Sequence, residues 1–136
     1  MADTLRLEIV TPDAIVYSED ADLVTLPSVE GMLGILPHHV GLMTQLAPGE
    51  IMVRRDGHDK FLAVGEGFVE VTGKGVAILT DMAIAADKID EAKAEEARQR
   101  AEARLRQKIS AAEIASVNAS LARSLAQLQV IRRRRA

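Results

Sequence analysis

The 136-residue chain contains no cysteine and no tryptophan, and it has only one tyrosine and two phenylalanines. The lack of cysteine excludes a disulfide framework, a thiol nucleophile and zinc held by thiolates. The scarcity of aromatic rings argues against a protein that stacks nucleic-acid bases on its side chains. No run of about 18 apolar residues occurs, so the sequence predicts no membrane span, and its first residues lack the apolar segment of a signal peptide.

Recognisable catalytic motifs are also missing. There is no HExxH, no GxSxG, no Walker-type glycine loop and no EF-hand loop. The three histidines are His38, His39 and His58, and no third ligand is signposted that would complete a metal site around the adjacent pair. We therefore expect a non-catalytic protein without a metal.

The sequence does contain an abrupt change of character near Asp87. Residues 1–87 carry 14 acidic and 5 basic side chains, a net charge of −9. Residues 88–136 carry 6 acidic and 12 basic side chains, a net charge of +6, so that the two parts together give the chain's −3. An acidic module followed by a basic module predicts a protein that docks by one end and acts with the other.

The first part has the pattern of many short strands. Leu5, Leu7 and Ile9 alternate with polar residues, which is typical of a half-buried strand. Turn signals such as Asp56-Gly57 recur at short intervals, and the runs between them are rich in β-branched residues. Eight to ten strands at this spacing predict an antiparallel sandwich or barrel.

The second part has the composition of two helices. From Asp90 to Ile109 there is no glycine or proline, and a second helix is predicted from Ser110, which has capping-box spacing to Glu113. Its predicted apolar face consists of Ile114, Val117, Leu121, Leu125 and Leu128. The two helices are expected to form an antiparallel hairpin. Because the joint also lacks glycine and proline, one continuous helix is an open alternative that loses cap contacts of about 1 kcal/mol.

Four consecutive arginines, Arg132–Arg135, stand near the end of the basic part. They are consistent with a solvated tail, or with a docking patch for an acidic protein, membrane or nucleic-acid surface. Nucleic acid is the weakest of these partners, because the acidic first part would repel phosphate.

The segment from Glu30 to His39 resembles a signature of the epsilon subunit of F-type ATP synthases. The matching positions at the family spacing are Gly31, Gly34, Pro37 and His39. The resemblance continues through Pro48-Gly49, residues 65–71, residues 79–83 and residues 89–94, and so covers essentially the whole chain. The mitochondrial delta and chloroplast epsilon subunits share this fold, and the composition favours a bacterial member.

The resemblance implies an N-terminal ten-stranded antiparallel β-sandwich over residues 1–87 and a C-terminal two-helix antiparallel hairpin over residues 88–136. It implies a non-catalytic central-stalk subunit that couples the rotor of a proton-translocating ATP synthase to its catalytic head. The implied partners are the gamma subunit, the c-ring and the catalytic alpha and beta subunits, at the cytoplasmic face of the bacterial inner membrane. By position, Glu30, Met32 and His39 are the candidate contacts with the c-ring.

In many bacterial members the hairpin is regulatory, and the resemblance implies two sites on it. An extended hairpin would inhibit ATP hydrolysis with its basic side chains facing the beta subunit, and the corresponding residues are Arg123, Arg132, Arg133, Arg134 and Arg135. A folded hairpin would bind regulatory ATP, and the corresponding residues are Ile89, Asp90, Lys93, Arg100 and Arg123. Lys93 replaces a family arginine and cannot reproduce its bidentate contact with phosphate. Two alternatives follow: an ATP-binding sensor, and an adaptor that uses its basic tail.

Overall fold

The computed structural model describes residues 3–135, which form ten strands, a short 3-10 turn and two helices. The strands are β1 (Leu5–Val10), β2 (Ile15–Ala21), β3 (Leu23–Ser28), β4 (Gly31–Ile35), β5 (Leu42–Leu46), β6 (Gly49–Arg55), β7 (His58–Val64), β8 (Gly67–Thr72), β9 (Gly75–Thr80) and β10 (Ala83–Ala85). They are followed by η1 (Ala86–Lys88), α1 (Glu91–Leu105) and α2 (Ala111–Arg135).

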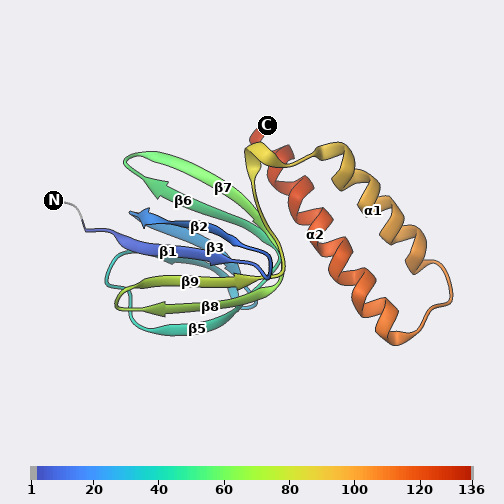
Figure 1. Ribbon diagram of the computed structural model, residues 1–136, viewed down its shortest axis with the longest axis horizontal. Coiled ribbons are helices and arrows are strands. Elements are labelled where there is room, and N and C mark those ends of the chain that lie inside the picture. Colours follow the sequence, from blue (N-terminus) through green and yellow to red (C-terminus); the bar gives the residue numbers. More distant parts are fainter. Residues whose placement is uncertain (1–2, 136) are drawn as a thin grey trace.

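The strands make one strongly curved sheet that wraps around a single core (Figure 1). Their order is β10-β7-β6-β3-β5-β8-β9-β1-β2, and β4 pairs with β3 outside this path. The predicted ten-stranded sandwich with its helical hairpin is confirmed, but β1 and β9 pair in parallel whereas the other described strand pairs are antiparallel. Local alternation cannot reveal this exception, because it depends on where the first strand inserts among strands much later in the chain.

Apolar and polar side chains alternate along β1, and the apolar ones form part of the core of the sandwich. Leu7 and Ile9 have no exposed surface and Leu5 has 5%, while the polar residues between them face solvent. Each such side chain stabilises the fold by roughly 1.5–3 kcal/mol on burial. The core therefore forms from the same period-2 pattern that predicts the strands.

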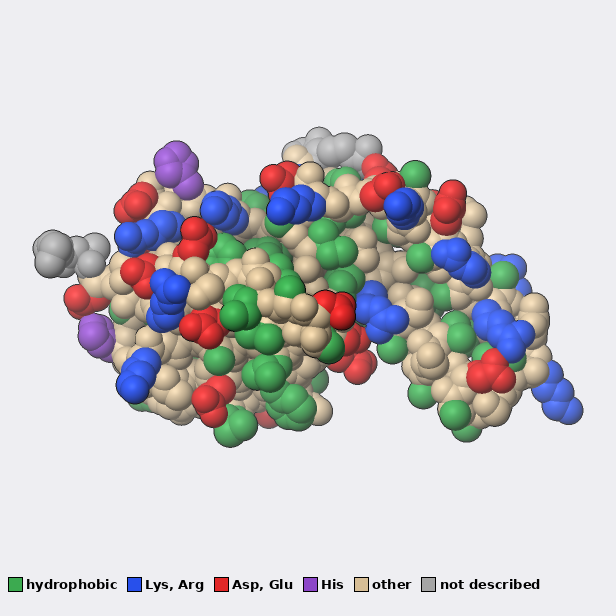
Figure 2. Space-filling model, viewed as in Figure 1, with side chains coloured by type: hydrophobic (Ala, Val, Ile, Leu, Met, Phe, Trp, Pro, Cys, Tyr) green, Lys and Arg blue, Asp and Glu red, His purple; other side chains and the backbone are tan. Residues whose placement is uncertain are grey.

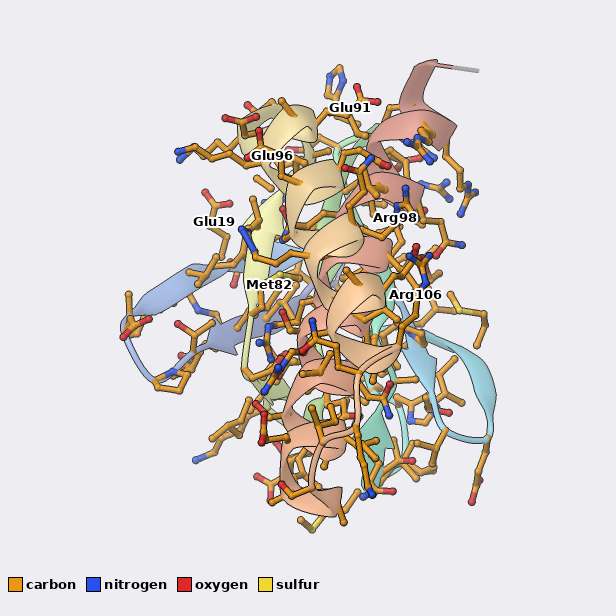
Figure 3. The ribbon with its side chains drawn as sticks, turned by 90° about the vertical axis from the view of Figure 1, so that its right-hand side faces the viewer. Glu19, Met82, Glu91, Glu96, Arg98 and Arg106 are labelled. Carbon is orange, nitrogen blue, oxygen red and sulfur yellow. The ribbon has the colours of Figure 1, made fainter. Side chains whose placement is uncertain are left out.

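Helix α2 lies between the sandwich and α1 (Figures 1 and 3). It packs on β6 and β7 on one side and on α1 on the other. A cluster formed by Ala63, Ile89, Ala126 and Val130 closes the contact between α2 and the sandwich. We call α1, α2 and their joint the arm.

The intermediate position of α2 corrects part of the predicted apolar face. Leu128 is buried as expected, but Leu125 is 46% exposed and Ile114 is 41% exposed. Ser124 and Ala126 are buried in their place. Near its C-terminal end, α2 is covered by the sandwich and by α1. Small residues outside the predicted apolar face are therefore buried there.

The joint between the helices is folded as a hairpin. Helix α1 ends at Leu105, before the predicted Ile109. The Ser110 hydroxyl accepts a hydrogen bond from the Glu113 N–H at 3.1 Å, which is one half of the predicted capping box. The Glu113 carboxylate instead accepts a hydrogen bond from Arg104 on α1, and this contact ties the two helices together across the joint.

Candidate functional site

The turn between β3 and β4 presents Glu30 to solvent. The Ser28 hydroxyl donates to the Gly31 carbonyl at 2.6 Å and accepts from the Glu30 N–H at 3.2 Å. Gly31 has φ 123°, a backbone conformation that glycine adopts without a steric penalty. A side-chain hydrogen bond and a glycine thus hold the predicted c-ring contact in an exposed turn.

Strand β4 leaves one long side open and apolar. Its only strand neighbour among the described residues is β3. Met32 on β4 is 65% exposed, and other exposed apolar side chains flank the strand: Val29, Leu36 and Val40. These side chains lie along β4 and beyond both of its ends. Exposed apolar side chains can mark contact surfaces, and a free strand edge is a natural place for a partner to dock. We call these four side chains the β4 edge.

The third predicted c-ring contact lies beyond the other end of this strand. Glu30 lies in the turn just before β4 and Met32 lies near the start of the strand, whereas His39 follows its end. The His39 N–H donates to the Leu36 carbonyl at 3.2 Å, and its ring Nδ1 lies 2.7 Å from the Val40 carbonyl oxygen. The structure therefore brings Glu30 and Met32 together but not His39, so a partner that touched all three would have to run along β4.

A second apolar surface crosses the outer face of the sheet. The strand register places Phe68 opposite Leu79, Leu79 opposite Val10, and Val10 opposite Ile15. Phe68 and Leu79 are each 55% exposed and Ile15 is 66% exposed. We call these four residues the outer stripe. Figure 2 shows hydrophobic side chains gathered over β5, β8 and β9 at this face, where Met43 on β5 is also exposed.

Tyr17 and Glu95 are among the groups outside these surfaces that have clearly shifted pKa values. Burial raises the pKa of Tyr17 to about 12, and the neighbouring Glu19 adds to the shift. A hydrogen bond from Arg98 holds the pKa of Glu95 below its ordinary value. Both shifts follow from local packing or ion pairing, and neither group lies in a cluster that resembles a catalytic site.

The first two predicted docking arginines make contacts within the chain. Arg123 on α2 donates to the Asp81 carboxylate of the sandwich at 3.0 Å. Arg132 donates to Glu95 at 3.2 Å and lies 3.8 Å from Glu91, both on α1. Arg123 thus joins the arm to the sandwich, whereas Arg132 joins the two helices of the arm.

The next two arginines meet the sandwich at one place. Arg133 donates to the Glu50 carboxylate at 2.9 Å, and Arg134 lies 3.7 Å from the same carboxylate. The Arg134 guanidinium also stacks 3.5 Å from the centre of the Phe61 ring. The side chain of Arg135 lies outside the described residues. In the folded hairpin, Arg123 and Arg132–Arg134 therefore contact residues of the same chain, which the sequence patterns did not single out as their partners.

The predicted ATP residues have structural roles in this fold. Ile89 belongs to the cluster between the arm and the sandwich. Asp90 is the N-cap of α1 and accepts a hydrogen bond from the Lys93 N–H at 3.1 Å. Arg100 lines a groove between α1 and α2, while Arg123 is paired with Asp81. The structure brings together Asp90 and Lys93, through the helix cap, and it assigns Arg100 and Arg123 to different surroundings.

Two further properties concern the described part of the chain. Within residues 3–135 no three histidine, aspartate or glutamate side chains come close enough to hold a metal ion. Neither helix over the same residues has the length and apolarity needed to cross a membrane.

Comparison with known proteins assigns both halves of this structure. Residues 4–86 match the family model of the ATP synthase delta/epsilon chain β-sandwich domain. Residues 87–132 match the model of the delta/epsilon chain long α-helix domain. The chain belongs to the ATP synthase delta/epsilon family. The predicted relationship is confirmed, and with it the prediction of a non-catalytic subunit.

Full-length relatives agree with this membership. The chain is 44% identical over 131 residues to an ATP synthase epsilon chain of Herpetosiphon aurantiacus, with 96% of each chain covered. It is 42% identical over 137 residues to an ATP synthase epsilon chain of Herminiimonas arsenicoxydans, with 99% of this chain and 98% of that one covered. Matches of this extent include the sandwich and the arm together.

Solved structures show the same arrangement. A chain in the mitochondrial ATP synthase of Euglena gracilis, in a structure of its OSCP, F1 and c-ring, matches with a TM-score of 0.75 at 26% identity. The match covers 93% of this chain and 79% of that one. A chain from the central stalk and c-ring of the Tetrahymena thermophila mitochondrial enzyme matches with a TM-score of 0.64 at 14% identity, covering 95% and 97%, and supports the fold.

Proposed function

We propose that the protein is a coupling subunit of the ATP synthase central stalk, with residues 1–87 as a permanent docking module and residues 88–136 as a movable regulatory arm. The observation that carries the docking role is the outer stripe, a row of apolar side chains fixed across four paired strands, of which Phe68, Leu79 and Ile15 are exposed. Large apolar side chains arranged contiguously on a rigid sheet are typical of a lasting protein interface. The outer stripe would bind the gamma subunit.

The β4 edge, together with Glu30 and His39 beside it, is the second docking surface in this proposal. Glu30 and Met32 would meet polar loops of the c-ring, and His39 would contact a partner at the far end of the strand. Exposure of Met32 and the fixed turn at Glu30 support this role. The subunit would then lie peripherally at the cytoplasmic face of the bacterial inner membrane, with the alpha and beta subunits within reach of the arm.

A charge placed in the outer stripe tests the docking role. Phe68→Asp should weaken co-purification with the gamma subunit at least tenfold, because the interface would have to bury an unpaired carboxylate. Thr72→Asp is the matched control, since Thr72 is exposed on the same strand at the end away from the stripe. Circular dichroism would verify that both variants are folded. Equal co-purification of the two variants would show that gamma binds elsewhere.

The regulatory role of the arm rests on the arginines of α2. In the proposal the arm extends from the folded hairpin, and Arg123 and Arg132–Arg135 then face acidic residues of the beta subunit. The ATP-sensor alternative stays a prediction. Two of its candidate residues, Asp90 and Ile89, have structural roles in the folded state that need no ATP. Calorimetry of the isolated chain with millimolar ATP would test it, and the absence of heat would count against a sensor.

A further inference from the structure

Glu50 is an acidic side chain in an unusual position. It lies near the start of β6, opposite Ala63 of β7, on the part of the sheet that α2 covers. Only 10% of its side chain is exposed. Its Oε1 accepts the hydrogen bond from Arg133, whereas its buried Oε2 has no hydrogen-bond partner and lies 3.7 Å from Arg134. A carboxylate in such a place is costly unless a cation accompanies it.

We propose that Glu50 and Phe61 form a receptor for arginine guanidinium groups, which we call the guanidinium cradle, and that its occupation by Arg133 and Arg134 holds the arm against the sandwich. The carboxylate supplies the charge, and the aromatic ring supplies a flat face on which the second guanidinium stacks. Both cations come from the last turn of α2. The cradle therefore recognises the end of the folded arm.

The neighbouring arginines, Arg132 and Arg123, make contacts that are less suited to holding the arm against the sandwich. Arg132 pairs with Glu91 and Glu95, and all three residues move with the arm. These ion pairs stay intact when the arm lifts from the sandwich as a closed hairpin, and they break only if the hairpin itself opens. Arg123 does reach the sandwich through Asp81, but the Asp81 side chain is 38% exposed whereas that of Glu50 is 10% exposed, and pairing with an exposed carboxylate contributes little.

A consequence for regulation rests on the proposed function. Arg133 and Arg134 cannot occupy the cradle and face the beta subunit at the same time. The folded arm and the docked arm then compete for the same guanidinium groups, so the strength of the cradle sets how readily the arm is released.

The test uses the full-length isolated chain and a single introduced thiol. Because the protein has no cysteine, Ala63→Cys places one thiol under α2, at a position with no exposed surface. Its rate of reaction with a thiol reagent reports how often the arm lifts. In this background Arg133→Met, which keeps the apolar stem but leaves Glu50 with weaker pairing, should speed labelling about tenfold or more. The matched control Arg132→Met should change the rate by about threefold or less.

Glu50→Gln provides the second arm of the test. This change removes the buried charge, so that Arg133→Met made in the Glu50→Gln background should no longer speed labelling. Loss of the Arg133 effect in that background identifies Glu50 as its partner, in the manner of a double-mutant cycle. An undiminished effect of Arg133→Met, or equal labelling of Arg133→Met and Arg132→Met, would overturn the cradle.

The outcome is separate from that of the proposed inhibition, because labelling needs no ATPase. If labelling follows the expectation while removal of the arm leaves ATP hydrolysis unchanged in the assembled enzyme, the cradle stands and inhibition by the arm fails. If labelling is insensitive to Arg133, the cradle fails whatever the ATPase measurement shows.

Discussion

At the scale of the residue, Gly67 shows how one missing side chain permits a close approach of two strands. A Cβ atom at this position would lie 1.8 Å from the Leu79 carbonyl oxygen, which belongs to the paired strand β9. Gly73, in the turn just after β8, has no atom within 4 Å of the corresponding position. The same residue type therefore has different importance at the two ends of one strand.

Gly67→Ala should lower the free energy of unfolding by about 2 kcal/mol or more, because backbone atoms must move to admit the methyl group. Gly73→Ala should change it by about 0.5 kcal/mol or less, as is usual at an unobstructed surface position. Urea denaturation of the isolated chain measures both. Similar midpoints for the two variants would show that the strands at Gly67 can separate at little cost.

The arginines are the residues for which sequence and structure complement each other. Their position and charge in the sequence make them candidate docking groups, but Glu50 and Phe61 carry no comparable signal. Glu50 lies 83 residues before Arg133 and is one of 14 acidic residues in the first part. Only the packing of α2 over β6 and β7 distinguishes it from the exposed acids.

At the scale of the element, the two helices owe their existence to local sequence and their faces to tertiary contact. The capping contact of Ser110 and the existence of helix α1 could be predicted from the sequence, because both depend on residues close together in the chain. The exposure of Leu125 was not, because it depends on α2 being covered by the sandwich and by α1 from two directions. A periodic pattern alone cannot tell how many neighbours a helix has.

Ser110→Ala should shift the equilibrium between the folded hairpin and a continuous helix. The hairpin loses its cap, whereas the continuous helix gains a better helix former at an interior position, so the ratio should move toward the extended arm by about fivefold or more. Spin labels on cysteines introduced at Gln99 and Asn118 would follow the distance between the helices. Ser116→Ala is the control, since Ser116 lies within α2 in the folded hairpin. Equal shifts in the two variants would show that the cap does not set the joint.

At the scale of the whole molecule, the change of charge near Asp87 coincides with the boundary between the sandwich and the arm. The acidic sandwich offers rigid apolar surfaces, and the basic arm is attached to it through a small cluster and a few ion pairs. In the proposed function the sandwich stays docked while the arm moves.

Truncation after Asp87 tests this division in the assembled enzyme. Assembly and proton-driven ATP synthesis should persist, because the outer stripe and the β4 edge lie within residues 1–87. ATP hydrolysis should rise, because the arginines that would dock on the beta subunit are removed. Steady-state hydrolysis at matched subunit content measures the change. Unchanged hydrolysis would show that the arm does not inhibit this enzyme.

Strand alternation, helix composition and charge were readable from the sequence because they depend on residues close together in the chain, and motif spacing added the family resemblance that implied the sandwich. Tertiary packing was needed to join β1 to β9 in parallel, to set His39 apart from Glu30, and to bring Glu50 and Phe61 to the arginines of α2. These features join residues far apart in the chain. Their energies arise from burial and ion pairing that exist only after the layers have packed.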